Sequence, residues 1–130
     1  MLPPGGKGAV GRAKGVPWKP LPALRYALRG MAFMLEPRNA RLLLAVTVVV
    51  VAAGFWLRLA PLEWCAALAA LALVWIAETV NTAVERLTDL VSPDYHPLAG
   101  KVKDIAAAAV LVAMLAAVSI GAVLFGPRLL

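Results

Sequence analysis

Three carboxylates and one carboxamide recur at helical spacing between positions 78 and 89. At 100° per residue of an α-helix, their side chains fall within an arc of about 80°. Like charges on one stripe repel each other, whereas a hard cation such as Mg²⁺ takes oxygen ligands of this kind together with phosphate oxygens. The pattern favours a helix face that binds a metal and phosphate over a helix end that is simply solvated. These residues are Glu78, Asn81, Glu85 and Asp89.

Glu78 differs from the other acids because it directly follows the 14 uncharged residues from Trp64 to Ala77. It therefore lies near the hydrocarbon edge of an apolar run. Ionisable residues within or beside hydrocarbon are costly and indicate a functional site. A carboxylate at this depth can meet the hydroxyl of a lipid, so the position favours a general base.

A proline-containing segment with two lysines follows the acidic stripe and leads into the next apolar run. Lys101 and Lys103 lie near the expected start of a helix, where free backbone N–H groups and cations favour phosphate. Lysines beside an apolar helix commonly act only as topology anchors, so a phosphate role for them depends on the acidic stripe. Neither a Walker A loop nor a kinase glycine-rich loop occurs in the sequence.

The composition places these residues in a membrane. Of the 130 residues, 62% are hydrophobic, whereas apolar residues make up about half of a soluble domain. A chain of this length cannot bury so much apolar surface in water, so lipid must cover the rest. The net charge is +6. Because the basic residues flank apolar spans, anionic lipid headgroups, and not nucleic acid, are the expected partners.

The chain is predicted to be an all-α membrane protein with a short basic arm. The arm, residues 1–17, is rich in Gly and Pro and cannot fold alone, and residues 18–130 form a single membrane domain. Apolar residues at steps of three and four oppose Arg25 and Arg29, which predicts an amphipathic helix in the membrane interface. The amphipathic helix is expected over about 23–36, and the transmembrane helices over about 40–57, 62–91 and 104–125.

The basic residues are distributed unevenly on the two sides of these spans. Eleven of the 13 Lys and Arg residues lie in the arm, in and just after the amphipathic helix, and around the second loop, whereas Arg58 and Arg128 lie on the opposite side. By the positive-inside rule, the amino terminus and the loop before the third span face the cytoplasm. The acidic stripe then lies on the side where ATP is available.

The same residues carry a resemblance to a known family. The run Glu78-x-Val-Asn-Thr-Ala-Val-Glu85-x-x-Thr-Asp89, followed by Tyr95-His-Pro-Leu-Ala and Lys103-Asp104, resembles the small bacterial diacylglycerol kinases, which include the undecaprenol kinases of Gram-positive bacteria. The resemblance is specific over about positions 75–112 and extends weakly over the amphipathic helix and the first span. Thr88 is a mild departure, since the family usually has Val before the final Asp.

The resemblance implies an ATP-dependent lipid kinase of the bacterial inner membrane, built as a homotrimer of three-span subunits with a surface helix. It would transfer the γ-phosphate of ATP to diacylglycerol, giving phosphatidic acid, or to undecaprenol, giving undecaprenyl phosphate. Glu78 would deprotonate the lipid hydroxyl, and Glu85 would hold Mg²⁺ together with the ATP phosphates. The positions that match the family around the nucleotide are Asn81, Glu85, Asp89, Lys103 and Asp104.

One metal-binding position of the family does not match directly. The family often has an acidic residue or Gln immediately before Arg-Asn at the start of the first span, and the acidic form is a metal ligand. Here Pro37 precedes Arg38-Asn39, and Glu36 lies one residue further back. Because Mg²⁺ sites use one or two carboxylates, we expect Glu36 to be the second ligand. The alternative is that phosphate and water complete the shell.

Two other classes of function fit parts of the pattern. A small ion-coupled transporter could use Glu78 as an intramembrane proton site, but the acids that follow and the Lys103-Asp104 pair would then have no role. A structural membrane subunit would explain the spans and leave the polar stripe unexplained. The choice between diacylglycerol and undecaprenol also stays open, because both present a primary hydroxyl at the membrane interface.

Overall fold

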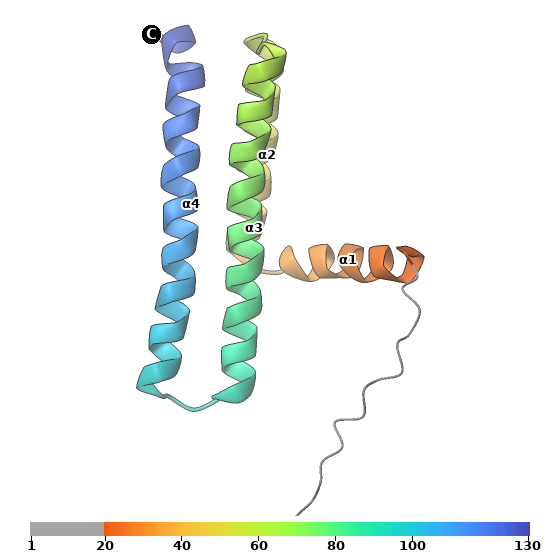
Figure 1. Ribbon diagram of the computed structural model, residues 1–130, viewed down its shortest axis with the longest axis vertical. Coiled ribbons are helices and arrows are strands. Elements are labelled where there is room, and N and C mark those ends of the chain that lie inside the picture. Colours follow the sequence, from red (N-terminus) through yellow and green to blue (C-terminus); the bar gives the residue numbers. More distant parts are fainter. Residues whose placement is uncertain (1–19) are drawn as a thin grey trace, which may run out of the picture. The chain divides into compact units, whose positions relative to one another are not determined.

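The structure is a computed structural model that describes residues 20–130, with side chains from Pro22 onward. The expected arm, residues 1–17, lies outside the described residues. In the described part every regular element is a helix, which confirms the all-α prediction (Figure 1). The helices are α1 (Pro20–Met34), α2 (Arg38–Trp56), α3 (Pro61–Val91) and α4 (Pro97–Leu129).

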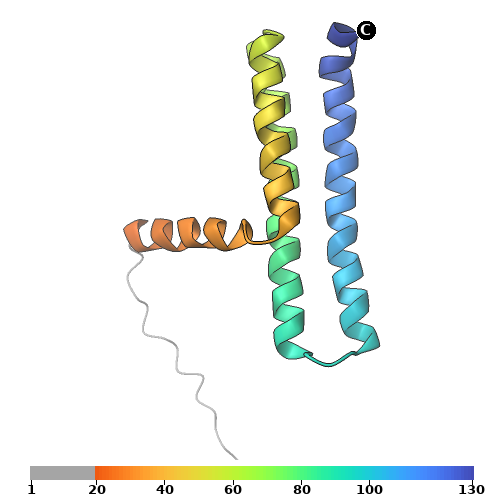
Figure 2. The ribbon, with the colours of Figure 1, turned by 180° about the vertical axis from the view of Figure 1, so that it is seen from behind.

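Three of these helices are long and apolar enough to cross a membrane, as predicted. The 19 residues of α2 extend about 28 Å, close to the ~30 Å thickness of a hydrocarbon core. With 31 and 33 residues, α3 and α4 are longer than that thickness requires. Their surplus length carries the polar residues of the candidate site. Figures 1 and 2 show α3 and α4 as an antiparallel hairpin, with α2 on another side of α3.

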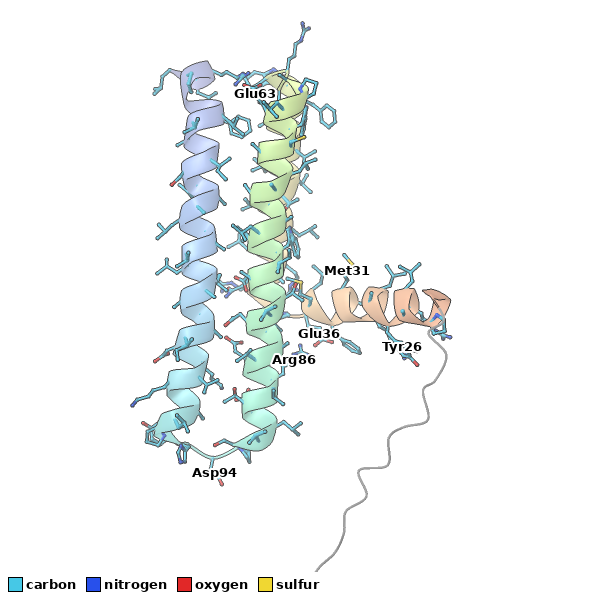
Figure 3. The ribbon with its side chains drawn as sticks, viewed as in Figure 1. Tyr26, Met31, Glu36, Glu63, Arg86 and Asp94 are labelled. Atoms are coloured by element: carbon cyan, nitrogen blue, oxygen red, sulfur yellow. The ribbon has the colours of Figure 1, made fainter. Side chains whose placement is uncertain are left out.

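α1 has the amphipathic pattern that the sequence predicts. Its exposed apolar side chains Leu24, Leu28 and Met31 recur at steps of four and three. The helix begins at Pro20, three residues earlier than expected, because the first helical turn tolerates proline. It ends at Met34 because Pro37 disfavours helical dihedrals at the residue before it. Tyr26 and Met31 point to different sides of this helix (Figure 3).

α4 begins seven residues before the expected start of the third span. Pro97 occupies the first helical position, which its fixed φ suits. His96 precedes it as the N-cap, and its Nδ1 accepts a hydrogen bond from the backbone N–H of Leu98 at 3.1 Å. The connecting segment after α3 is therefore short, and Lys101 and Lys103 extend from the first two turns of a helix instead of from a loop.

Two ion pairs join α3 to α4, one near each end of the hairpin. Arg128 Nη2 contacts both carboxylate oxygens of Glu63, at 2.8 and 2.7 Å, while Lys103 pairs with Asp89. The length of α3 between the two pairs, from position 63 to position 89, is nearly the same as the length of α4 between them, from position 103 to position 128. Figure 3 shows Glu63 and Asp94 at opposite ends of the hairpin. The two pairs together fix the register of α4 along α3.

The turn between α2 and α3 depends on close packing at Gly54. A Cβ on this residue would lie 2.6 Å from Cη2 of Trp64 and 3.2 Å from the side chain of Leu59. The Trp64 ring also packs against Phe55, with ring centroids 4.8 Å apart. Leu59 is buried in the small core at this end. Glycine therefore allows the aromatic ring to lie directly on the α2 backbone.

Gly54→Ala is expected to lower the thermal unfolding midpoint of the protein in detergent. The added methyl group must displace the Trp64 ring, and overpacking of this kind typically costs about 1–3 kcal/mol. Gly126→Ala is a suitable control, because a Cβ there meets nothing within 4 Å and alanine is a better helix former than glycine. Equal midpoints for Gly54→Ala and the wild type would show that the turn adjusts without cost.

Candidate active site

The four polar residues predicted to share a stripe lie on one continuous helix, α3. Asn81 Nδ2 donates a hydrogen bond to Glu85 Oε1 at 3.2 Å. Asn81 Oδ1 is buried and has no hydrogen-bond partner among the described residues. Buried carbonyl oxygens are normally paired, because leaving one unsatisfied costs the full desolvation penalty. The orphaned oxygen beside Glu85 therefore indicates a position where a donor or a cation from outside the described chain would bind.

The donor set at this position fits a hard divalent cation. Glu85 is exposed and makes no ion pair with any described residue. The described part of the chain contains no group of three or more His, Cys, Asp or Glu residues placed to hold a metal. A cation here would therefore take one or two carboxylates from the protein and its other ligands from elsewhere. Mg²⁺ binds in this way when it is bound with phosphate and water.

Glu78 is half-buried at the polar end of an apolar groove. The groove has a volume of about 500 Å³ and lies between α2, α3 and α4. Among the described residues that line it, Asn39 and Glu78 are the polar ones. On α3 the lining extends from Ala67 to Glu78, about 16 Å along the helix axis. An apolar channel of this length that ends at a carboxylate suits an alkyl chain with a polar head.

The residues predicted to surround the nucleotide are brought together only in part. Lys103 reaches across from α4 to pair with Asp89 at the far end of the stripe. Asp104 follows Lys103 on α4 but is exposed, and its side chain pairs with no described residue. The cationic side of the candidate site is therefore provided by α4, and its acidic side by α3.

Glu36 lies against α3 at the level of the acidic stripe. Its Oε2 accepts an ion-paired hydrogen bond from Arg86 Nη2 at 2.9 Å, and Figure 3 shows the two residues close together. Arg86 directly follows Glu85 in the chain. The folded chain thus brings an acid from the segment before α2 to the Arg86 side of α3, at the level of Glu85 along the helix axis. The assignment of Glu36 as a metal ligand stays a prediction.

Several polar contacts near the site were not predicted from the sequence. Trp75 Nε1 donates to Thr47 Oγ1 on α2 at 2.9 Å. One turn further along α3, Thr79 Oγ1 lies 2.9 Å from Met34 Sδ. Thr47 is the only hydroxyl residue in the apolar run of α2. This isolated hydroxyl group is the feature of the sequence that could have indicated a polar contact. Its partner could not be identified, because the contact depends on how the two helices face each other.

Comparisons with known proteins agree with this arrangement. The family described as "Prokaryotic diacylglycerol kinase" matches residues 25–125. A diacylglycerol kinase of Synechocystis sp. is 39% identical over 112 residues, which cover 85% of this chain and 64% of that protein. An undecaprenol kinase of Bacillus subtilis is 35% identical over 71% of this chain and 75% of its own length. A diacylglycerol kinase of Escherichia coli is 34% identical over 82% of this chain and 80% of its own length.

The match includes α1 from residue 25 onward, all of α2 and α3, and α4 up to residue 125. It therefore covers every described residue of the candidate site, together with the three membrane-spanning helices. The matched region spans about two thirds of the Synechocystis protein. The chain is a multi-pass membrane protein, and it belongs to the prokaryotic diacylglycerol kinase family.

Proposed function

We propose that this protein is an ATP-dependent kinase that phosphorylates the primary hydroxyl of a membrane lipid, either diacylglycerol or undecaprenol. The observation that carries the proposal is the position of Glu78. It ends an apolar groove and lies one helical turn from Asn81, whose free oxygen and hydrogen bond to Glu85 mark the cation-binding face. Membership of the kinase family supports the same activity. Neither the structure nor the comparisons support the transporter alternative.

The reaction assigns a separate task to each part of the site. The lipid chain lies in the groove and presents its hydroxyl to Glu78, which accepts the proton as a general base. The hydroxyl oxygen bonds to the γ-phosphorus of ATP, and the bond from that phosphorus to the bridging oxygen breaks to release ADP.

Lys103 faces the phosphates from α4, with Asp89 and Asp104 beside it. Glu85, Asn81 and Glu36 would hold Mg²⁺, which when bound neutralises charge on the phosphates.

The orientation in the membrane and the assembly are part of this proposal. The excess of basic residues supports a cytoplasmic amino terminus and a cytoplasmic active site in the inner membrane. A homo-oligomer is supported by the run of small residues from Ala106 to Ala109, which allows close packing between helices, and the number three is what the family resemblance implies.

The function is tested by phosphate transfer to defined lipids. Purified protein in mixed micelles would receive ATP labelled at the γ-phosphate, with diacylglycerol or undecaprenol as acceptor in parallel reactions. Label in one lipid fraction that depends on both protein and Mg²⁺ is the expected result, and the preferred lipid identifies the substrate. Absence of label in both lipids, with protein shown to be folded, would contradict the kinase proposal.

The assembly is tested by mixing two inactive variants, Glu78→Gln and Glu85→Gln. If a site combines these residues from neighbouring subunits, mixed oligomers contain some intact sites and activity returns in part. If both residues of a site come from one chain, no activity returns even when subunit exchange is demonstrated. Cross-linking of the wild type in detergent measures the number of subunits, for which three is expected.

A further inference from the structure

The apolar groove that ends at Glu78 is closed at its other end. A small buried core lies there, made of Leu59 from the turn between α2 and α3, Ala67 from α3 and Leu124 from α4. Phe125 packs against this core and also lines the groove. The groove therefore extends from a carboxylate at one end to packed side chains at the other, and a chain that enters beside Glu78 has a limited depth available.

The register of the α3–α4 hairpin gives the depth of each α4 residue in the groove. Glu63 of α3 pairs with Arg128 of α4. Counting seven residues forward from Glu63 and seven back from Arg128 places Gly121 level with Ala70, and both residues line the groove. Ala70 precedes Glu78 by eight residues, about 12 Å along the helix axis. Gly121 therefore lies about 12 Å from the level of the carboxylate.

Gly121 lies in the middle of the α4 face that lines the groove. Its neighbours on this face are Ala117, Val118, Leu124 and Phe125. At 100° per residue, these four side chains fall within about 60° of Gly121 around the helix. A Cβ at Gly121 would meet no atom of the described residues within 4 Å. The missing side chain therefore leaves open space along the centre of the groove.

The cross-section of the groove suits a single alkyl chain. A volume of about 500 Å³ over a length of about 16 Å gives a mean cross-section of about 30 Å². An α-helix with its side chains is about 10–12 Å across, which corresponds to roughly 80 Å² or more. The groove is therefore too narrow to enclose a helix of another subunit along its length, whereas one hydrocarbon chain fits.

We propose that Gly121 determines the length of alkyl chain that the groove accepts. An extended chain of single bonds advances about 1.2 Å per bond, so a chain that starts at Glu78 passes Gly121 at roughly its tenth bond. Because residue 121 is glycine, roughly four further bonds fit before the core around Leu124. A larger side chain at position 121 would end the groove at that depth. This inference rests on the proposed kinase function, since it assigns the chain-length specificity of the same site.

The dependence of KM on chain length tests the inference. Wild type and Gly121→Leu would be assayed in mixed micelles with acceptors whose chains have about eight and about sixteen carbons. The acceptors are diacylglycerols or, if the enzyme prefers undecaprenol, prenols of two and four isoprene units. Gly121→Leu should raise the KM of the long acceptor at least about fivefold, the lower end of the cost of overpacking. The KM and kcat of the short acceptor should not change, because its chain ends before Gly121.

Two matched leucine substitutions identify depth as the cause. Ala117 lies on the same face one helical turn nearer Glu78, where a chain passes at roughly its fifth bond. Ala117→Leu should therefore raise the KM of the short acceptor as well as that of the long one. Gly126→Leu adds the same side chain to α4, but it projects about 140° away from Gly121, and Gly126 is not among the residues that line the groove. It should leave both KM values unchanged.

An equal rise in KM for both acceptors in Gly121→Leu, or no rise for either, would overturn the inference. A changed number of subunits on cross-linking of this variant would also overturn it, because small residues on α4 would then pack against a helix of another subunit. If Gly121→Leu does not fold, Gly121→Val decides by the same criteria. A folded wild type that phosphorylates neither acceptor class at any chain length would reject the kinase proposal itself, and with it this inference.

Discussion

Glu78→Gln is expected to lower the rate of phosphate transfer to lipid by about 10²- to 10⁴-fold, the usual cost of removing a general base. The amide is nearly the same size as the carboxylate, but it cannot accept the hydroxyl proton. Because the Glu78 side chain makes no ion pair or hydrogen bond with the described residues, the fold should not depend on its charge. Single-turnover measurement with saturating lipid, ATP and Mg²⁺ isolates the chemical step.

Asp94→Asn provides the matched control for this substitution. It also converts an acid to its amide, but Asp94 is exposed in the segment between α3 and α4, and we assign its side chain no role in the reaction. Its rate should equal that of the wild type. Turnover above about a tenth of the wild-type value for Glu78→Gln would remove Glu78 as the base, and the proton would have to pass to another group.

Glu85→Gln is expected to raise the Mg²⁺ concentration needed for half-maximal activity by at least about tenfold and to weaken ATP binding. Loss of groups that only support metal ligands typically costs 10- to 100-fold in metal affinity, and a direct ligand should cost at least as much. The Gln side chain still offers Oε1 to Asn81 Nδ2, so the contact within the helix is retained. The expected loss of Mg²⁺ affinity is therefore caused by removal of the Glu85 charge and not by loss of its hydrogen bond to Asn81.

The two substitutions differ in their response to excess metal. High Mg²⁺ should restore part of the activity of Glu85→Gln, because phosphate and water can complete the shell of the ion. It should not restore Glu78→Gln, because proton acceptance does not depend on occupancy of the metal site. An Mg²⁺ titration of Glu85→Gln that superimposes on that of the wild type would exclude Glu85 from metal binding.

The sequence by itself determined the helices and the acidic face. Apolar runs of sufficient length specify membrane helices, because every backbone polar group in lipid must be paired within its own segment. The relation between Glu78, Asn81 and Glu85 is also local, since residues on one helix keep the angular spacing of that helix whatever packs around them. The first residues of two helices were predicted less accurately than the helices themselves. Pro20 and Pro97 begin helices that the apolar pattern placed later, because proline suits a first turn and carries no hydrophobic signal.

Only the tertiary structure decided which groups from different helices meet. Arg86 directly follows Glu85 in the sequence, and the structure shows that it pairs with Glu36, 50 residues away in the chain. The groove that ends at Glu78 likewise requires α2, α3 and α4 together. Such contacts depend on the rotation and register of each helix against its neighbours. These are set by many small packing terms, by residues such as Gly54 and by ion pairs such as Glu63–Arg128, and the period of a single helix does not contain them.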